Sequence, residues 1–333
     1  MKKASWVKAT YAIEVENLVK RFGDFEAIKS ISFKVRRGEV FAFLGPNGAG
    51  KTTTVHILTT LLKPTDGKAK VAGLDVVKEA KEVRKKIGIV FQEPSVDRDL
   101  TAYENMLIHG GVYGLSGVKL RDKIERLLRF VELWDFKDRL VRHFSGGMQR
   151  RLEIARSLLH EPEVLFLDEP TLGLDPQTRV HVWNYIKTIK EEHDMTVFLT
   201  THYMEEAEKL ADKIAIIDHG KIIAEGRCDE LKKLVGSDVV YVRVDSNAEC
   251  FEEGDFIKSC KVLRDGRIRI DVENAAEALP KIFEIAREKG VKIVEMTYHQ
   301  PTLNDVFLHL TGREIRDEGG EFFKTIVRSW MRR

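Results

Sequence analysis

A glycine-rich segment that ends in lysine and threonine is the strongest chemical signal in the chain. Residues 45–52 are GPNGAGKT and fit the pattern G-x-x-x-x-G-K-[ST]. In such a loop the backbone N–H groups surround phosphate oxygens, Lys51 neutralises the β and γ phosphates, and the hydroxyl of Thr52 can bind Mg²⁺. The pattern alone also fits a glycine-rich turn with a surface lysine. Because an apolar run precedes it and helical spacing follows it, we predict a phosphate-binding loop.

Two adjacent carboxylates follow a second apolar run, VLFLDE, and end at Glu169. Ligands of open α/β sheets lie beyond the carboxyl ends of strands, which is where Asp168 and Glu169 stand. We expect Asp168 to hold Mg²⁺ and Glu169 to orient or deprotonate an attacking water. The alternative is an acidic cap at the start of a helix. Two carboxylates beside a phosphate loop favour hydrolysis over simple binding.

Three further side chains follow predicted strands and have weaker individual signals. His202 ends the run MTVFLTTH and could donate a hydrogen bond to a γ-phosphate oxygen, although a histidine there is more often a surface or packing residue. Gln92 could reach Mg²⁺ or the water through its amide oxygen, although a glutamine before a proline-containing loop is usually a turn residue. Phe22 is more often part of a core than a platform for adenine.

A second anion site is predicted where Ser145, Gly146 and Gly147 precede a segment with helical spacing. The N-terminus of a helix exposes N–H groups and the positive end of the helix dipole. The alternative is an ordinary serine cap with glycine for a tight entry into the helix.

The elements that position these residues follow from hydrophobic patterning. Continuous apolar runs at residues 39–44, 164–168 and 195–202 predict strands buried on both faces of a largely parallel sheet. Alternating patterns predict one hairpin around FGDF, at residues 22–25, and another with its turn at His219 and Gly220. Residues 80–159 are largely helical in pattern. The first domain is therefore predicted to be α/β.

The pattern changes near Gly236, where short strands and one helix predict a small α+β domain at residues 237–312. Residues 313–333 form a basic amphipathic tail that could lie on an anionic membrane surface or against a membrane protein. The alternative is a terminal helix docked on its own domain, or a frayed tail.

Composition excludes several classes of protein. The 333 residues carry a formal net charge of +2, so no global field argues for nucleic acid. The three cysteines, Cys228, Cys250 and Cys260, lack C-x-x-C spacing and favour reduced thiols. The chain contains neither a signal-peptide pattern nor an apolar stretch long enough for a spanning helix. We therefore do not expect it to cross a membrane alone.

Six motifs, taken in order, resemble those of the ATP-binding-cassette (ABC) ATPases. They are GPNGAGKTT as the P-loop, Gln92 as the Q-loop, FSGGMQ as the signature, VLFLDEP as Walker B, LGLD ending at Asp175 as the D-loop, and His202 as the switch histidine. The resemblance covers most of residues 13–226. It implies a P-loop NTPase fold at residues 11–236, with a RecA-like core, an antiparallel β subdomain and a helical subdomain at about residues 95–160.

The resemblance also implies roles for particular residues. Glu169 is the catalytic base, assisted by His202 and Gln92, while Mg²⁺ is held by Thr52, Gln92 and Asp168. ATP is contacted by the P-loop, by an adenine-stacking Phe22, by the signature and by the D-loop, that is by Phe22, Gly45, Pro46, Asn47, Gly48, Ala49, Gly50, Lys51, Thr52, Thr53, Ser145, Gly146, Gly147 and Asp175.

The chain departs from the family pattern at three positions. Phe144 replaces the usual leucine of the signature. Met148 replaces its glutamine and cannot supply the amide contacts of that side chain. Phe22 stands where a tyrosine is usual and keeps the stacking face without the hydroxyl. Ser145 and the two glycines of the signature remain.

Two further motifs, one within the cassette and one near the C-terminus, narrow the resemblance. PTLGLDPQTR and PTLNDVFLHLTGREIRD are similar to those of the daunorubicin-resistance type of ABC export ATPase. This similarity implies an ATP-hydrolysing subunit with ATP and Mg²⁺ as cofactors and no nucleic acid. It also implies a cytoplasmic location at the inner face of the membrane, where a homodimer or heterodimer of ATPase subunits serves a separately encoded multi-span permease.

Two other functions are compatible with parts of the sequence. A non-transport ABC ATPase of DNA repair or of ribosomes usually has tandem cassettes or long coiled coils, whereas this chain has one P-loop and no sustained heptads. A P-loop kinase of a small metabolite would leave the SGG helix and His202 unexplained. The exported substrate is not predicted, because specificity in this family lies mainly in the membrane subunit.

Overall fold

The computed structural model describes residues 10–193, 195–235, 238–245, 255–263 and 267–311. These residues fall into two compact units, one extending to Arg227 and the other beginning at Cys228. The domain boundary predicted from the sequence lies later, at residues 236 and 237, which are outside the described residues. The second unit begins earlier because helix α8 (Cys228–Lys233) packs against helix α10 (Leu303–Thr311) of that unit.

A six-stranded sheet forms the centre of the first unit, in the order β10-β9-β3-β8-β7-β6. All neighbouring strands are parallel except β10, which pairs antiparallel with β9. The strands are β3 (Val40–Leu44), β6 (Ile87–Val90), β7 (Val164–Asp168), β8 (Thr196–Thr201), β9 (Lys213–Asp218) and β10 (Lys221–Gly226). Every residue of β3, β7 and β8 is buried, which confirms the prediction of strands covered on both faces.

A second, antiparallel sheet packs on the first through phenylalanine rings. Its order is β2-β1-β4-β5, with β1 (Tyr11–Phe22), β2 (Phe25–Arg36), β4 (Asp66–Val71) and β5 (Leu74–Asp75). Phe33 of β2 lies 5.4 Å from Phe41 and 5.9 Å from Phe198 between ring centroids. Such aromatic pairs contribute more stabilising free energy than the burial of their apolar area alone provides. The predicted hairpin at residues 22–25 is confirmed.

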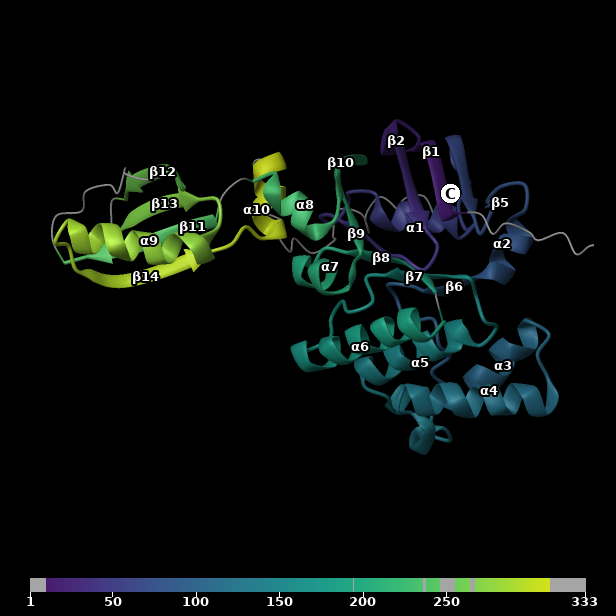
Figure 1. The fold of residues 1–333 in the computed structure, drawn as a ribbon. Coiled ribbons are helices and arrows are strands. Elements are labelled where there is room, and N and C mark those ends of the chain that lie inside the picture. The colour runs from purple at the N-terminus through teal and green to yellow at the C-terminus, as the bar shows by residue number, and fades with distance from the viewer. Residues whose placement is uncertain (1–9, 194, 236–237, 246–254, 264–266, 312–333) are drawn as a thin grey trace, which may run out of the picture. The chain divides into compact units, whose positions relative to one another are not determined.

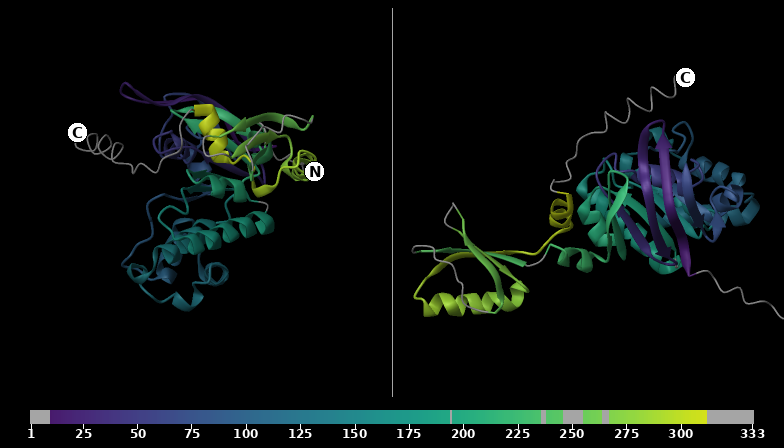
Figure 2. Two further views of the ribbon diagram at one scale, coloured as in Figure 1. Left: turned by 90° about the vertical axis from the view of Figure 1, so that its left-hand side faces the viewer. Right: turned by 90° about the horizontal axis from the view of Figure 1, so that it is seen from above.

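The helices of the first unit complete an α/β arrangement. Helices α3, α4, α5 and α6 gather on one side of the six-stranded sheet, with β1 and β2 on the other (Figures 1 and 2). The helices are α1 (Lys51–Leu58), α2 (Ala80–Lys86), α3 (Ala102–Val112), α4 (Gly117–Phe130), α5 (Gly146–Leu158), α6 (Pro176–His193) and α7 (Met204–Leu210). Among the described residues no helix combines the length and apolarity that crossing a membrane requires.

The second unit has its own sheet and its own core, as an α+β domain should. Four antiparallel strands follow the order β12-β13-β11-β14, with β11 (Asp238–Val244), β12 (Ile257–Val262), β13 (Ile268–Val272) and β14 (Ile293–His299). Helix α9 (Ala275–Glu288) packs Ala278, Ile282 and Ala286 against the sheet. The small C-terminal α+β domain is thus confirmed, whereas the tail at residues 313–333 lies outside the described residues.

Candidate functional site

The phosphate-loop sequence connects strand β3 to helix α1, as predicted. Gly50 has φ 106°, in the left-handed region that favours glycine, and a Cβ there would lie 2.7 Å from the carbonyl oxygen of Ala27. A Cβ on Gly45 would lie 2.2 Å from the carbonyl oxygen of Ile217. The two glycines therefore let the loop turn tightly against neighbouring backbone, and α1 begins directly after it at Lys51.

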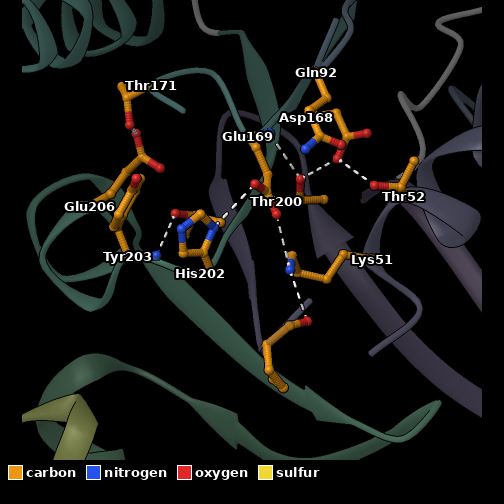
Figure 3. A network of polar contacts seen from close by, with 12 residues as sticks. Lys51, Thr52, Gln92, Asp168, Glu169, Thr171, Thr200, His202, Tyr203 and Glu206 are labelled. Carbon is orange, nitrogen blue, oxygen red and sulfur yellow. Dashed lines mark hydrogen bonds and ion pairs between the residues drawn. The ribbon is translucent and has the colours of Figure 1, made fainter. Parts of the chain in front are cut away.

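Lys51 is buried inside this loop and makes three contacts (Figure 3). Its Nζ donates to the carbonyl oxygens of Gly45 at 2.8 Å and Pro46 at 3.1 Å, and lies 3.1 Å from Oε1 of Glu169. Burial lowers the pKa of Lys51, and the nearby carboxylates oppose this shift. The ammonium group thus connects the loop to the carboxylate at the end of β7.

Asp168, the last residue of β7, is buried and accepts two hydrogen bonds from hydroxyl groups. The donors are Thr200 Oγ1, at 2.5 Å, and Thr52 Oγ1, at 3.3 Å. Burial raises the pKa of Asp168, while the two hydroxyl groups oppose this shift. Thr200 was not predicted as a site residue; it comes into contact because it lies opposite Asp168 in the parallel register of β7 and β8.

Glu169 is held in an unusual backbone conformation between two basic side chains. Its φ of 48° lies in the left-handed region, which costs a side-chain-bearing residue about 1–3 kcal/mol. Its N–H donates to both the carbonyl and the hydroxyl oxygen of Thr200, each at 3.1 Å. Burial acts to raise the pKa of Glu169, but hydrogen bonding from His202 and the charge of Lys51 outweigh it, and the net shift is downward. Glu169 is therefore ionised and able to accept a proton.

His202 follows β8 and is buried against Glu169, rather than lying on the surface. Its Nδ1 lies 3.1 Å from Oε2 of Glu169. A carboxylate oxygen can only accept, so Nδ1 carries the proton in this contact. The ring of Tyr203 lies 4.0 Å from the imidazole, and the guanidinium of Arg179 covers the Tyr203 ring at 4.1 Å. This stacking fixes the orientation of the imidazole.

Gln92 follows β6, which is the neighbour of β7 in the sheet. Because the two strands are parallel, Gln92 stands at the same edge of the sheet as Asp168. Its side chain is exposed, whereas its carbonyl oxygen accepts a hydrogen bond from Arg150 Nη2 at 3.1 Å.

The signature segment begins helix α5 and makes other contacts. Ser145 Oγ accepts from the N–H of Met148 at 3.2 Å, so the serine caps the helix. A Cβ on Gly147 would lie 2.4 Å from Thr178 Cγ2, so this glycine lets the helix start approach α6 closely. Met148 contributes its backbone N–H to the cap, and nothing else in the structure explains its presence.

Two other predicted residues, Phe22 and Asp175, lie in the first unit away from the side-chain network of Figure 3. Phe22 ends β1 half-buried, with Lys20 Nζ 4.9 Å from its ring centroid. Asp175 is exposed and accepts from the N–H of Thr178 at 3.0 Å, just before α6. The network itself unites Lys51, Thr52, Asp168, Glu169 and His202, which are five of the residues predicted from motifs.

Two buried groups next to this network, Thr200 and Arg150, were not predicted from the sequence. Thr200 has a signal that could have been used, since it is a hydroxyl residue near the end of a buried strand. Arg150 has no comparable signal, because a charged residue inside a helix is usually exposed.

A phosphate loop at the end of β3, with an aspartate and a glutamate at the end of β7, defines a P-loop nucleotide hydrolase. Residues 28–172 match the family model described as ABC transporter, and residues 226–311 match that described as ATP-binding protein DrrA1-3-like, C-terminal domain. Daunorubicin resistance ATP-binding protein DrrA3 of Streptomyces coeruleorubidus is 41% identical over 92% of this chain and 98% of its own length. Nod factor export ATP-binding protein I of Ralstonia nicotianae is 38% identical over 93% and 97%.

The chain therefore belongs to the ABC transporter ATP-binding proteins of the daunorubicin-resistance type, and it is an ABC transporter ATPase. It is also similar to a solved dimeric ATP-binding cassette in a post-hydrolysis state, bound to ADP and Pi. That match has a TM-score of 0.59 and 30% identity, and covers 65% of this chain and 98% of the other. The predicted fold and class of enzyme are thereby confirmed.

Proposed function

We propose that this chain is the ATP-hydrolysing subunit that powers an exporter of a drug-, antibiotic- or lipid-like substrate through a separately encoded membrane permease. The observation that carries the catalytic part is the ionised Glu169, held between Lys51 and His202 beside the phosphate loop. Export is supported by the relatives, one of which is named for daunorubicin resistance and another for Nod factor export. The subunit would work in the cytoplasm, at the inner face of the membrane.

The donor set beside the loop fits Mg²⁺. Thr52 and Asp168 bring a hydroxyl and a carboxylate oxygen within 3.3 Å of each other, and Gln92 adds an amide oxygen at the same sheet edge. The described residues contain no group of three or more His, Cys, Asp or Glu side chains suited to a metal. Mg²⁺ typically uses one or two carboxylates and takes its other ligands from substrate phosphates and water. When bound, it would neutralise charge on the β and γ phosphates.

The remaining roles follow from charge and position. Lys51 and the N–H groups of the loop, with Thr53, would bind the phosphates, and Phe22 would stack on adenine. Glu169 would accept a proton from the water whose oxygen attacks the γ phosphorus, and the P–O bond to ADP would break. His202 would hold Glu169 and the γ phosphate in place.

The signature and the D-loop would act on a nucleotide bound by a second ATPase subunit, identical or related. Ser145, Gly146 and Gly147 stand at a helix N-terminus, where N–H groups and the helix dipole favour phosphate. Asp175 is exposed next to this segment, with Leu174 3.6 Å from where a Cβ on Gly146 would lie. The solved relative supports this arrangement, because it is a dimer.

Substitution of Glu169 tests the catalytic proposal. Glu169→Gln removes the proton acceptor and keeps the shape, so we expect kcat to fall by about 10²–10⁴-fold. MgATP binding should be retained, and size-exclusion chromatography with MgATP should show a trapped dimer. Glu163→Gln is the matched control, because Glu163 precedes β7 at its opposite end and pairs with Arg37 and Lys86. Sustained steady-state turnover by Glu169→Gln would reject Glu169 as the base.

Co-purification tests the export proposal. We expect the tagged chain to retain a multi-span membrane protein encoded by an adjacent reading frame when membranes are solubilised in mild detergent. ATP hydrolysis by the purified pair should respond to the transported substrate class. Association with ribosomes or DNA-repair proteins, without a membrane partner, would contradict the exporter assignment.

A further inference from the structure

Helix α5 holds the segment that contains Gln92 through side chains spaced three residues apart. Arg150 Nη1 donates to the carbonyl oxygen of Phe91 at 2.6 Å, and its Nη2 donates to that of Gln92 at 3.1 Å. Glu153 Oε1 accepts from the N–H of Ser95 at 2.6 Å and from its hydroxyl at 3.1 Å. Arg156 Nη1 donates to the carbonyl oxygen of Ser95 at 2.8 Å. The loop at residues 91–95 is therefore fixed to one face of α5.

Two of these charged side chains are almost completely buried. Arg150 and Glu153 are 6% and 1% exposed and form an ion pair at 3.1 Å. Burying such a pair costs hydration that its own attraction does not reliably recover, and apolar residues often replace it without loss of stability. Here the pair supplies directed donors and acceptors to the backbone of an exposed loop, which apolar residues cannot do. This favours a positioning role over a purely stabilising one.

The same helix carries the signature segment. Ser145 caps α5, and Arg150 follows five positions later, a separation of about 7–8 Å along a helix axis. A helix with intact hydrogen bonds moves as a unit over such a distance. A displacement of the Gln92 backbone is therefore transmitted to Ser145, Gly146 and Gly147 of the same subunit.

We propose that Arg150, oriented by Glu153, is a positioning residue that fixes the backbone of Gln92 and couples it to the signature segment. The inference rests on the proposed function, because it takes Gln92 to be a ligand of Mg²⁺-ATP. Arg150 itself contacts neither nucleotide nor metal in this scheme. By holding the backbone of Gln92, Arg150 determines which positions the side-chain amide of Gln92 can occupy.

Hydrogen–deuterium exchange of the full chain without nucleotide tests the anchoring directly. Arg150→Gln should speed exchange of the Ser95 amide and its loop by at least about tenfold, because Glu153 loses its partner and the carbonyls lose their donor. The second variant, Arg150→Met with Glu153→Leu, replaces the pair by apolar groups. It should remain folded even if Arg150→Gln, which leaves Glu153 buried without its partner, does not. The matched control is Arg129→Gln with Glu125→Gln, which removes an exposed ion pair of α4 at 2.8 Å. Unchanged loop exchange in the folded variants would overturn the proposal.

A double-mutant cycle with Gln92→Ala tests whether Arg150 acts through Gln92. Arg150→Gln should raise the Mg²⁺ concentration for half-maximal ATP hydrolysis by about tenfold, the scale seen when support of a metal ligand is removed. Arg150→Lys, which can still donate to a carbonyl oxygen, should recover part of this loss. Adding Arg150→Gln to Gln92→Ala should cause no further change. Losses that add in the double variant would overturn the proposal.

The cycle also separates this inference from the function on which it rests. If Gln92→Ala alone has normal Mg²⁺ dependence, the role of Gln92 in the proposed function is wrong and the coupling to catalysis fails with it. If Gln92→Ala is impaired and Arg150→Gln is normal, only the positioning role fails.

Discussion

Two buried carboxylates of the first unit differ in the direction of their pKa shifts. Burial raises the pKa of Glu206, whose Oε1 accepts from Thr171 Oγ1 at 2.8 Å and from Trp183 Nε1 at 3.0 Å. Glu169 is also buried, yet contacts with His202 and Lys51 outweigh burial and lower its pKa. The carboxyl group of Glu206 accepts hydrogen bonds from uncharged donors, whereas the charge of Lys51 favours the ionised form of Glu169. Glu169 is thus held in the ionised form that the proposed role as a base requires.

Glu206 should make the stability of the first unit depend on pH. Because its folded pKa is raised, the folded state binds more protons than the unfolded state, and this group's contribution falls as pH rises from about 4. Glu206→Gln removes that dependence. We therefore expect the Tm of the variant, relative to the wild type, to increase with pH by about 2–4 °C per kcal/mol of relieved burial cost. Thermal unfolding between pH 4.5 and 8.5 measures this.

The control for this prediction is Glu125→Gln, which removes an exposed carboxylate of α4. It should leave the pH profile of Tm parallel to that of the wild type. A relative Tm of Glu206→Gln that falls with pH would contradict the sign derived from the raised pKa.

At the level of single residues, motif type and order predicted which side chains gather at the site but not their mutual contacts. Lys51, Asp168 and Glu169 each stand in a loop or at a strand end, where ligands of α/β sheets lie. His202 could be assigned only through its place in the order of the family motifs. Thr200 could not be assigned, because its contact with Asp168 depends on the register of two strands that pairs residues 32 positions apart in the chain.

At the level of elements, hydrophobic patterning predicted the buried strands of the six-stranded sheet but not which strands are neighbours, and it gave no prediction for β4 and β5. The buried strands β3, β7 and β8 were evident from continuous apolarity. Their order in the sheet, β10-β9-β3-β8-β7-β6, does not follow the chain. It depends on long-range packing, such as Phe33 of β2 against Phe198 of β8, which local periodicity does not encode.

Helix α5 shows the other limit of pattern-based prediction. Its helical spacing was recognised, but the spacing gave no prediction for its charged residues. Arg150 and Glu153 are buried, because the Gln92 loop brings backbone groups that need partners. Charged side chains that are buried because they bond to a neighbouring loop do not change the hydrophobic periodicity of their helix, so the sequence pattern does not reveal them.

For the whole molecule, the two units have separate hydrophobic cores. The first is built around Phe41, Phe43 and Phe198, and the second around Val240, Ile270 and Ile282. Each core can in principle support cooperative unfolding of its own unit. The residues of this chain that we propose to contact nucleotide all lie in the first unit.

We therefore expect MgATP to shift one of two unfolding transitions. At a hundred times its Kd, a ligand stabilises the unit that binds it by about 2.7 kcal/mol, and the second unit should be unaffected. Differential scanning calorimetry of Glu169→Gln, in which we expect hydrolysis of the nucleotide to be slowed, measures both transitions. The shift of each transition with MgATP is compared with the shift caused by ADP without Mg²⁺. An equal upward shift of both transitions would show that the units do not unfold separately.

The β9–β10 hairpin has a consequence for how the protein is made. Gly220 at its turn donates its N–H to the carbonyl oxygen of Ala49 and accepts from the N–H of Lys29. The phosphate loop is thus held by residues that are synthesised long after it. At about 5–20 residues per second, a ribosome takes roughly ten to thirty seconds to pass from Gly50 to Gly220. During that interval the nascent chain carries a complete P-loop sequence without the backbone partners that shape it, so ATP can assist folding only near the end of synthesis of the cassette.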